Sequence, residues 1–332
     1  MKILVTGSSG FIGALLCDRL AADGFTVRGF DNKCAVDQPF ECVTGDIRDN
    51  HLLPKALNSI DIVVHLIAMH HDFGIADDEY FEINEKGTKD LLDCCSKTGV
   101  KRFVFFSSVA VYGTQPDPTD ENTIPNPDTP YGKSKLAAER ILERWQKADR
   151  SRQVIIIRPT VVFGPRNYAN VYNLINQIYK KKFLMVGDGS NIKSVAYVEN
   201  LVDATRFLIR QLKPGVAIYN YSDEPQMTIK EIVTTIAENA NISIPERQLP
   251  FWAASLFGGV FHLLSKATGY NFPITRNRIK KFCTTTHHKA NKVRKLGFKP
   301  RITLREGFKR TVDWYIANHN RESIVKTVTP GH

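Results

Sequence analysis

The sequence contains no long apolar run. No stretch reaches the ~20 apolar residues that a membrane-spanning helix needs. The nearest, FWAASLFGGVFHLL at 251–264, is long enough only for a buried or interfacial helix. The chain opens with MKILVTG, a strand-and-turn pattern that lacks the basic and apolar regions of a secretory signal. We therefore expect a cytoplasmic protein.

Cysteine is scarce and lacks the spacing of metal ligands. The six cysteines lie far apart or directly adjacent, and the histidine pairs in MHHD (69–72) and THHK (286–289) are neighbours that point to different faces. Metal ligands have to converge on one point, so we expect no metal site. In the cytoplasm all six thiols are expected to be reduced.

Acidic residues are almost missing from residues 271–310, which hold thirteen Lys/Arg and one acid, Glu306. This segment alone carries a net charge of +12, so that the rest of the chain is close to neutral and the whole chain has +11. Its aromatic residues do not alternate with the basic ones as a base-stacking surface requires, and no nucleic-acid-binding signature accompanies the charge. We expect a solvated basic face with one or two phosphate-binding arginines, and no nucleic-acid partner.

What the first half does contain is an alternation of short strands and helices. Strand patterns lie at 2–7, 26–31, 40–46, 61–67, 102–108 and 153–159, and helical patterns at 11–23, 49–59, 78–98 and 131–149. Apolar strands separated by helices predict a doubly wound parallel sheet of the Rossmann type, an α/β fold. We predict a dinucleotide-binding domain over 1–158 that shares strands beyond it, a smaller interleaved lobe over 159–320, and a tail over 321–332.

A glycine-rich turn separates the first predicted strand from the first helix. In VTGSSGFIGALL, Gly7 permits the tight turn, Gly10 lets the backbone approach a pyrophosphate, and Gly13 allows close helix–sheet packing. Asp31 ends the second strand, where a carboxylate accepts ribose hydroxyls and repels the 2′-phosphate of NADP. Asp46 ends the third strand, beside the expected adenine. The pattern predicts NAD as cofactor.

In order and spacing, the motifs resemble those of the extended short-chain dehydrogenase/reductase family, especially its nucleotide-sugar epimerases and dehydratases. They are TGSSGFIG (6–13), GDIRD (45–49), VVHLIA (63–68), INEKGT (83–88), SSVAVYG (107–113), YGKSK (131–135), RPTVVFGP (158–165) and VAYVENLVDA (195–204). The resemblance covers nearly the whole chain. It implies a homodimer formed through helices 78–98 and 131–149.

The resemblance also implies the catalytic residues. Tyr131 is expected to be the acid/base, Lys135 its partner on the same helix face, and Ser108 the hydroxyl bonded to the reacting sugar oxygen. An unperturbed tyrosine has a pKa near 10, so a neighbouring ammonium has to stabilise the phenolate for proton transfer at neutral pH. His65 is expected to be a packed histidine at a strand end.

The remaining expected contacts follow from the same motifs. Those to the cofactor are completed by Ser9, Phe11, Ile12, Asn32, Ile47, Leu66, Ile67, Ala68 and Pro159. Those to the substrate are, besides Ser108 and Tyr131, Val109, Asn84, Lys193, Arg276 and Arg278. For Asn84 the alternative is an amide on a helix surface, and for the two arginines it is ordinary solvated surface.

The two residues after Ser108 bear on the type of reaction. The resembling 4,6-dehydratases carry an Asp-Glu pair after the serine, where this chain has Val109 and Ala110, so we expect no dehydratase. The leading hypothesis is an NAD-dependent enzyme that acts at C4 of a nucleotide-activated hexose, with UDP as the expected nucleotide, in surface-polysaccharide synthesis. The sequence leaves a 4-epimerase and a 4-ketoreductase both open.

Residues 249–270 suggest another class of substrate. They resemble the hydroxysteroid and sterol dehydrogenases and enzymes that act on polyprenyl-linked sugars. In this alternative the segment contacts an anionic membrane surface, whereas otherwise it packs on the second lobe. A third class, a non-catalytic dinucleotide sensor, has no reason to retain Ser108, Tyr131 and Lys135 together.

Overall fold

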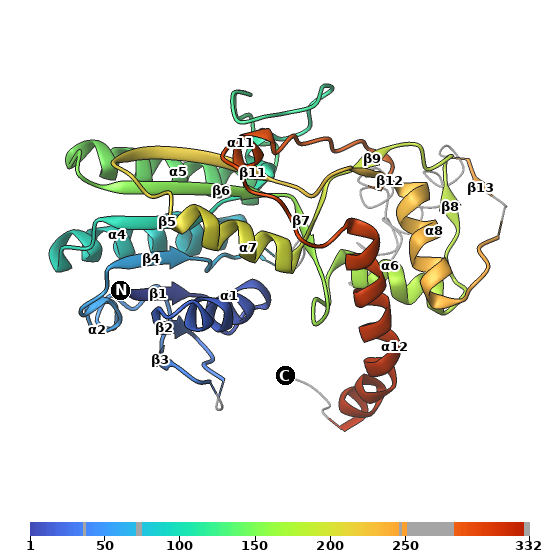
Figure 1. The fold of residues 1–332 in the computed structure, drawn as a ribbon, viewed down its shortest axis with the longest axis horizontal. Coiled ribbons are helices and arrows are strands. Elements are labelled where there is room, and N and C mark those ends of the chain that lie inside the picture. The colour runs from blue at the N-terminus through green and yellow to red at the C-terminus, as the bar shows by residue number, and fades with distance from the viewer. Residues whose placement is uncertain (36–37, 71–74, 246–247, 251–281, 329–332) are drawn as a thin grey trace. The chain divides into compact units, whose positions relative to one another are not determined.

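The computed structural model describes residues 1–35, 38–70, 75–245, 248–250 and 282–328, and the side chains of these up to 319. Two compact units are present (Figure 1). Unit 1 comprises Met1–Val162, Val198–Ser222 and His288–Arg301, and unit 2 comprises Phe163–Tyr197, Asp223–His287 and Ile302–His332. The chain thus enters unit 1 three times.

Unit 1 is built on a seven-stranded parallel sheet with the order β11-β6-β5-β4-β1-β2-β3. The strands are β1 (Lys2–Thr6), β2 (Thr26–Asp31), β3 (Glu41–Thr44), β4 (Ile62–His65), β5 (Arg102–Phe106), β6 (Gln153–Pro159) and β11 (Gly215–Tyr221). The predicted doubly wound α/β fold is confirmed. The strand order reverses between β1 and β4, and ligands of such sheets bind outside the carboxyl ends of the strands at this point.

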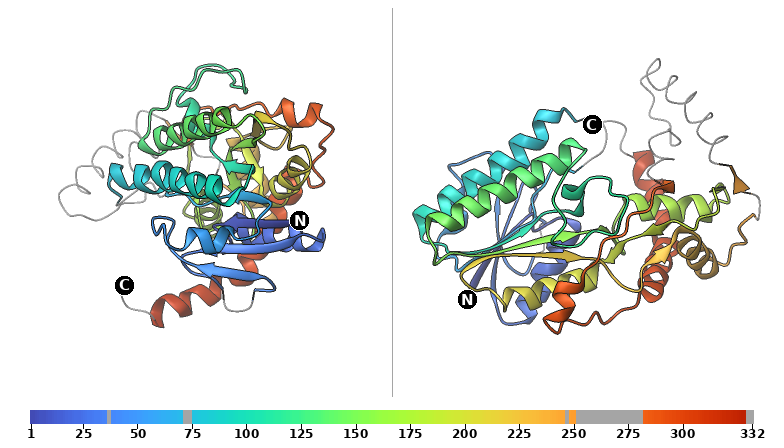
Figure 2. Two further views of the ribbon diagram at one scale, coloured as in Figure 1. Left: turned by 90° about the vertical axis from the view of Figure 1, so that its left-hand side faces the viewer. Right: turned by 90° about the horizontal axis from the view of Figure 1, so that it is seen from above.

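Helices cover both faces of the sheet (Figure 2). They are α1 (Phe11–Ala22), α2 (Leu53–Leu57), α3 (Asp77–Tyr80), a π-helix η1 (Phe81–Lys86), α4 (Gly87–Thr98), a 3₁₀-helix η2 (Val109–Tyr112), α5 (Pro130–Ala148), α7 (Val198–Ile209) and α11 (Asn291–Lys295). Helices α4 and α5 pack side by side, and α1 packs against α7. Leu91, Phe103 and Leu142 are fully buried in the core under α4 and α5.

Unit 2 is mainly helical. It contains α6 (Asn170–Tyr179), α8 (Ile229–Ala240) and α12 (Leu304–Val328), with the short strands β8 (Met185–Val186), β9 (Ile192–Lys193), β10 (Val195–Tyr197), β12 (Met227–Thr228) and β13 (Gln248–Leu249). Strand β7 (Val161–Phe163) lies where the chain leaves unit 1. Phe163 stacks on Phe308 with ring centroids 4.3 Å apart in the core of this unit.

The structure of the last residues differs from the prediction. Residues 321–328, expected to follow the last lobe as a tail, continue α12. The sequence there contains neither proline nor glycine before 330, so nothing in it stops a helix.

The prediction that all six cysteines are reduced is wrong for two of them. Cys34 and Cys42 form a disulfide, with Cα atoms 6.1 Å apart, a separation that suits this bond. Cys34 follows β2 and Cys42 lies in β3, which pairs with β2 in register. The loop between the strands therefore brings the two thiols together, which the linear spacing did not reveal. Cys17, Cys94, Cys95 and Cys283 are free thiols.

Within the described residues, no helix is both long and apolar enough to cross a membrane. Of the segment 249–270, for which we expected either packing or membrane contact, all residues from 251 on lie outside the described part of the chain.

Candidate active site

The glycine-rich turn joins β1 to α1 in the geometry that a diphosphate requires. Gly7 has a φ of +74°, and the amide of Gly10 donates to its carbonyl at 3.1 Å. A Cβ on Gly13 would lie 1.9 Å from the Gly7 oxygen, so only glycine fits. Within the described part of the chain, no side chain caps the N-terminus of α1, which leaves its first amides for an anion.

The structure brings Asp31 to this turn. One oxygen of the carboxylate accepts a hydrogen bond from the Ser9 amide at 3.0 Å, and the other accepts from the Lys33 amide at 3.1 Å. Each carboxylate oxygen has a second lone pair, so the group can still accept two ribose hydroxyls. The neighbouring Asn32 is exposed. Two backbone amides thus hold the Asp31 carboxylate at the end of β2, beside the glycine-rich turn.

The third strand end is less open to a ligand than expected. Asp46 forms an ion pair with Arg48, which also donates its backbone amide. The hydrogen bond from Arg48 holds the pKa of Asp46 below its usual range. Ile47 is only 3% exposed and belongs to the hydrophobic core. An adenine contact at these two residues stays a prediction.

The end of β4 is a buried polar cluster. His65 is fully buried, with Nδ1 2.6 Å from the Thr6 hydroxyl and Nε2 3.2 Å from the Thr88 hydroxyl. Burial, and to a smaller extent the charge of Lys135, lowers the pKa of His65 to about 3. The ring is therefore neutral at physiological pH and packed, as the sequence analysis expected. The next residue, Leu66, donates its amide to Thr6, so the chain passes over the glycine-rich turn.

Ser108 and Tyr131 lie at the N-terminal ends of two helical elements, η2 and α5, that are packed tightly together. Ser108 caps η2, accepting from the Ala110 amide at 3.1 Å. Thr129 caps α5, and a Cβ on Gly132 would lie 2.4 Å from the Ala110 oxygen. The glycine of YGKSK is therefore what lets the helix carrying Tyr131 approach the turn carrying Ser108. Val109 is half-buried on the same turn.

Lys135 is one turn further along α5 and is only 1% exposed. Its ammonium lies 4.5 Å from the centroid of the Phe105 ring, a cation–π contact. Burial lowers the pKa of Lys135 to about 7, while the negative charge of Glu139 acts in the opposite direction. Tyr131 and Lys135 share a face of α5, as their spacing predicts, and the side chain of Lys135 lies inside the protein.

Asn84 is completely buried, so the alternative of a surface amide is wrong. It lies in η1, and π-helical turns are frequent at functional sites. Its oxygen accepts from the Met69 amide at 2.7 Å, and its nitrogen donates to the Met69 oxygen and the Ser134 hydroxyl. Both amide hydrogens are thus used within the protein. Asn84 connects the loop after β4 to α5, and a contact between Asn84 and the substrate stays a prediction.

A buried ion pair beneath Lys135 was missed by the sequence analysis. Glu139 and Arg158 are buried and form a bidentate pair, with N–O distances of 2.9 and 2.5 Å. Arg158 also donates to the hydroxyl of Tyr112, which donates to Asn220. The available signal was the spacing of Lys135 and Glu139, again four residues apart on one helix face.

The substrate contacts expected outside unit 1 are only partly described. Lys193 lies in unit 2, where its ammonium donates to the Thr284 carbonyl. Burial lowers its pKa to about 8. Ser194 beside it donates to Gln226. Arg276 and Arg278 lie outside the described residues, so a diphosphate contact at these three basic residues stays a prediction.

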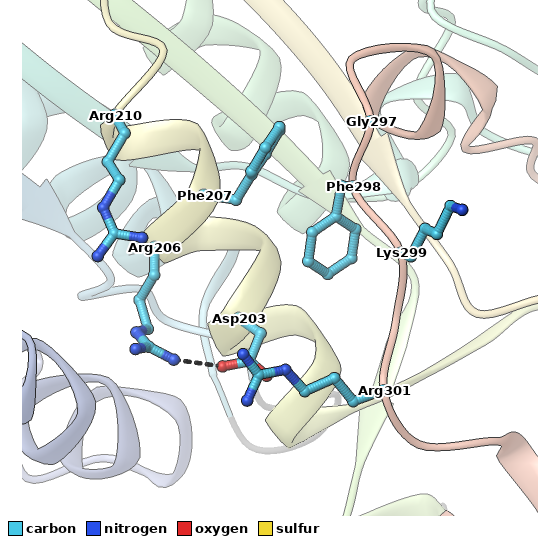
Figure 3. A pocket seen from close by; sticks show the side chains of 8 residues that line it. All are labelled: Asp203, Arg206, Phe207, Arg210, Gly297, Phe298, Lys299 and Arg301. Atoms are coloured by element: carbon cyan, nitrogen blue, oxygen red, sulfur yellow. Dashed lines mark hydrogen bonds and ion pairs between the residues drawn. The ribbon is translucent and has the colours of Figure 1, made fainter.

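A basic cavity of about 310 Å³ lies within unit 1, between α7 and residues 297–301 (Figure 3). Arg206 pairs there with Asp203 and with Asp23 at the end of α1, and Arg301 lies 3.8 Å from Asp203. Lys299 and Arg301 are exposed. The ion pairs connect α7 to α1, and the exposed cations form part of the solvated basic face expected from the sequence.

The residues of unit 1 fit a dinucleotide at the carboxyl edge of the sheet. The turn leaves room that a Cβ would fill, α1 offers uncapped amides, and Asp31 is fixed beside both. Two buried hydroxyls after β5 and β6, those of Ser107 and Thr160, have no hydrogen-bond partner within the described structure. Buried hydroxyls without partners are costly, so a polar ligand at this edge explains them. Pro159 is buried beside Thr160.

Replacing Asp31 with asparagine is expected to weaken NAD binding by about ten- to a hundredfold, because hydrogen bonds to a charged acceptor contribute about 1.5–3 kcal/mol. Discrimination against NADP should fall as well, since no carboxylate repels the 2′-phosphate. Titration calorimetry with both dinucleotides measures these changes. Asp18→Asn, an exposed acid on α1, is the matched control. Unchanged affinity for both dinucleotides would contradict the role of Asp31.

Comparisons with known proteins agree with this geometry. Residues 3–221 match the model of the NAD dependent epimerase/dehydratase family. The chain is 40% identical to an N-acetyl-alpha-D-glucosaminyl-diphospho-ditrans,octacis-undecaprenol 4-epimerase of Escherichia coli O157:H7, covering 97% of this chain and 98% of the relative. It is 31% identical to a UDP-glucose 4-epimerase of Vibrio cholerae, covering 96% and 97%.

Among solved structures, the chain is similar to MoeE5 in complex with UDP-glucose and NAD, with a TM-score of 0.75 and 26% identity over 98% of this chain and 100% of that one. A UDP-glucuronic acid 4-epimerase from Bacillus cereus has the same fold, with a TM-score of 0.77 at 23% identity over 96% and 99%. This chain belongs to the NAD-dependent epimerase/dehydratase family and is an NAD-dependent enzyme.

Proposed function

We propose that the protein is a 4-epimerase of a hexose that is joined through a diphosphate to a polyprenyl carrier, with an N-acetylated hexosamine as the sugar. The observation that carries the epimerase part is the packing of η2 on α5, which puts the elements bearing Ser108 and Tyr131 in contact above the buried Lys135. The relative at 40% identity supports the carrier and the sugar.

The chain supplies the proton chemistry of this reaction. NAD, which the glycine-rich turn and Asp31 would hold, would supply the acceptor and donor of the C4 hydride. Ser108 holds the oxygen on C4, and Tyr131 takes the hydroxyl proton as C4 is oxidised to the ketone. After the keto-sugar has turned over, Tyr131 returns the proton to the oxygen as C4 is reduced from the other face. The charge of Lys135 stabilises the phenolate during both steps.

The turn after β5 argues against the related elimination reaction. Val109 and Ala110 stand directly after Ser108, where the resembling dehydratases have two carboxylates. Neither residue can act as a general acid or base, so the ketone formed at C4 is reduced and not dehydrated. This is why we prefer an epimerase although human dTDP-D-glucose 4,6-dehydratase is also similar, at 26% identity.

A nucleotide carrier is the second candidate, because the relative of 31% identity is named a UDP-glucose 4-epimerase. A nucleotide-linked sugar is the leading hypothesis of the sequence analysis. A polyprenyl-linked sugar stands beside sterols in the alternative given in that section. A 4-ketoreductase of a nucleotide-linked sugar and a homodimer through α4 and α5 also stay predictions, as does a role in surface-polysaccharide synthesis.

The test is to supply the purified protein and NAD with two substrates in parallel. One is N-acetylglucosaminyl diphosphoundecaprenol in detergent, and the other is UDP-N-acetylglucosamine. The sugar is released by acid and separated by chromatography. We expect N-acetylgalactosamine from the lipid-linked substrate at least tenfold faster than from the nucleotide.

Turnover of the nucleotide alone would overturn the polyprenyl carrier and favour the second candidate. No inversion at C4 of either substrate, in a preparation that binds NAD, would overturn the proposed epimerase. Net consumption of NADH with a 4-keto sugar would point to the ketoreductase instead.

A further inference from the structure

Two charged side chains follow the proposed acid/base along α5. Tyr131, Lys135 and Glu139 are spaced four residues apart along α5 and therefore share a face. Lys135 and Glu139 are each 1% exposed. Glu139 is held from the far side by both ends of the Arg158 guanidinium. The row ends in a buried ion pair and not in solvent.

Among the residues that the structure describes, few other charges surround Lys135. From β4, His65 is neutral. From β5, Phe105 offers its ring face. From β6, Arg158 contributes a positive charge that is bound to Glu139. On α5 itself, Tyr131 and Glu139 are the titratable neighbours. Glu139 is therefore the negative group that opposes the loss of the Lys135 proton.

We propose that Glu139, anchored by Arg158, is a positioning residue that keeps Lys135 in its charged form and so makes Lys135 able to stabilise the phenolate of Tyr131. This inference rests on the proposed function, in which Lys135 acts on Tyr131. It assigns Glu139 a task in the reaction although Glu139 is covered by protein and touches neither substrate nor cofactor.

The charge balance of the row supports this role. With Tyr131 protonated, Lys135, Glu139 and Arg158 together carry one net positive charge. Ionisation of Tyr131 makes the whole set neutral, which a poorly solvated site favours. Without the charge of Glu139, Lys135 and Arg158 would remain as two buried cations without this counter-charge, and burial disfavours the charged form. Lys135 would then give up its proton, because arginine does not.

Arg158 has the complementary task. Burial opposes its charge, but the hydrogen bonds and charge of Glu139 raise the pKa of Arg158 above its ordinary value. Since Arg158 also donates to Tyr112, which is bonded to Asn220 on the neighbouring strand, its guanidinium is fixed from two sides. A fixed guanidinium fixes the carboxylate, and with it the field at Lys135.

The inference is tested by measuring the protonation of Lys135 directly. The protein is labelled with ¹³Cε-lysine and titrated by NMR, and the Lys135 signal is the one missing from Lys135→Met. Glu139→Gln is expected to move the midpoint of this signal to lower pH by at least about one unit, a tenfold change in proton affinity. Glu143→Gln, a half-buried glutamate one turn further along α5, is the matched control and should leave it unchanged.

Glu139→Gln leaves Arg158 buried without a counter-charge, which can prevent folding. The double variant Glu139→Gln/Arg158→Met removes both charges, a replacement that proteins often tolerate. The double variant should also move the midpoint of the Lys135 signal to lower pH. In Glu139→Asp, which retains the carboxylate, the midpoint should lie within about half a pH unit of the wild type. An unchanged midpoint in a folded Glu139→Gln or double variant would overturn the inference.

Kinetics supply the second readout. The alkaline limb of the pH–rate profile should move to lower pH in Glu139→Gln together with the NMR midpoint. A role in stability alone would reduce the amount of active enzyme without moving the limb. If the midpoint moves while the wild-type protein inverts no sugar, the proposed function fails and the electrostatic link stands. If the protein is an epimerase and the midpoint does not move, only the inference fails.

Discussion

Replacing Tyr131 with phenylalanine is expected to reduce kcat for C4 inversion by about 10²- to 10⁴-fold, the range that general acid–base groups contribute. The variant loses the oxygen that moves the proton and retains the ring, which packs edge-on against Tyr80 at a centroid distance of 6.4 Å. The fold and the NAD site should therefore be preserved. Steady-state kinetics with the accepted substrate, together with NAD titration, measure both properties.

The control for this substitution is Tyr168→Phe. Tyr168 is 56% exposed and lies in unit 2, so that removal of its hydroxyl should leave kcat within about twofold of the wild type. Full activity of Tyr131→Phe would exclude Tyr131 as the acid/base. It would also reopen the alternative of a protein that binds a dinucleotide without catalysing a reaction.

The second large effect is expected for Gly13→Ala. The added methyl group would lie 1.9 Å from the Gly7 oxygen and 3.0 Å from the Ser8 Cα, both of them backbone atoms. Because backbone cannot rotate away, the turn has to move off α1, and we expect NAD affinity to fall more than about a hundredfold. The free energy of unfolding should drop by about 1–3 kcal/mol, as for other overpacked sites.

Gly24→Ala separates these two effects. Gly24 lies just beyond the other end of α1, with a φ of +82° and no atom within 4 Å of an added Cβ. Its substitution should cost about 1 kcal/mol of stability from backbone strain and leave NAD affinity unchanged. Calorimetric titration and thermal unfolding measure both variants. Gly13→Ala with wild-type affinity for NAD would show that the turn does not cradle a diphosphate.

Local sequence signals predicted the sheet well because each of its central strands is apolar throughout. Residues of β1, β4 and β5 are almost entirely buried on both faces, so their composition shows the strand without knowledge of its neighbours. Strand β11 was not among the six predicted. Its first four residues are half-buried because it lies at the sheet edge, and its pattern therefore resembles that of an irregular segment.

The chemistry of the site followed from short motifs, but the residues that position it did not. The glycine-rich turn and the pair of Tyr131 and Lys135 are each contained within one stretch of sequence. The partners of Asn84 and Glu139 are 15 and 19 residues away, in a loop and in a strand. A buried polar residue is recognised by the partner it finds after folding, which the spacing within one helix cannot show.

The disulfide is a second contact that the local sequence does not reveal. Cys34 and Cys42 are eight residues apart, which by itself predicts nothing. They meet because β2 and β3 are adjacent in the sheet. The loop that they close begins at Cys34, three residues after Asp31, so the bond joins the end of β2 to β3 close to the acid.

The repeated entry of the chain into unit 1 has a consequence for how the protein is made. During synthesis, the first 162 residues emerge with β6 as an open sheet edge, because β11 is encoded more than fifty residues later. An exposed edge can pair with other chains. The edge of β6 therefore stays unpaired, and the nascent chain prone to aggregation, until residues 215–221 have left the ribosome and paired with it. In a fragment that ends at residue 158, this edge would never be paired with β11.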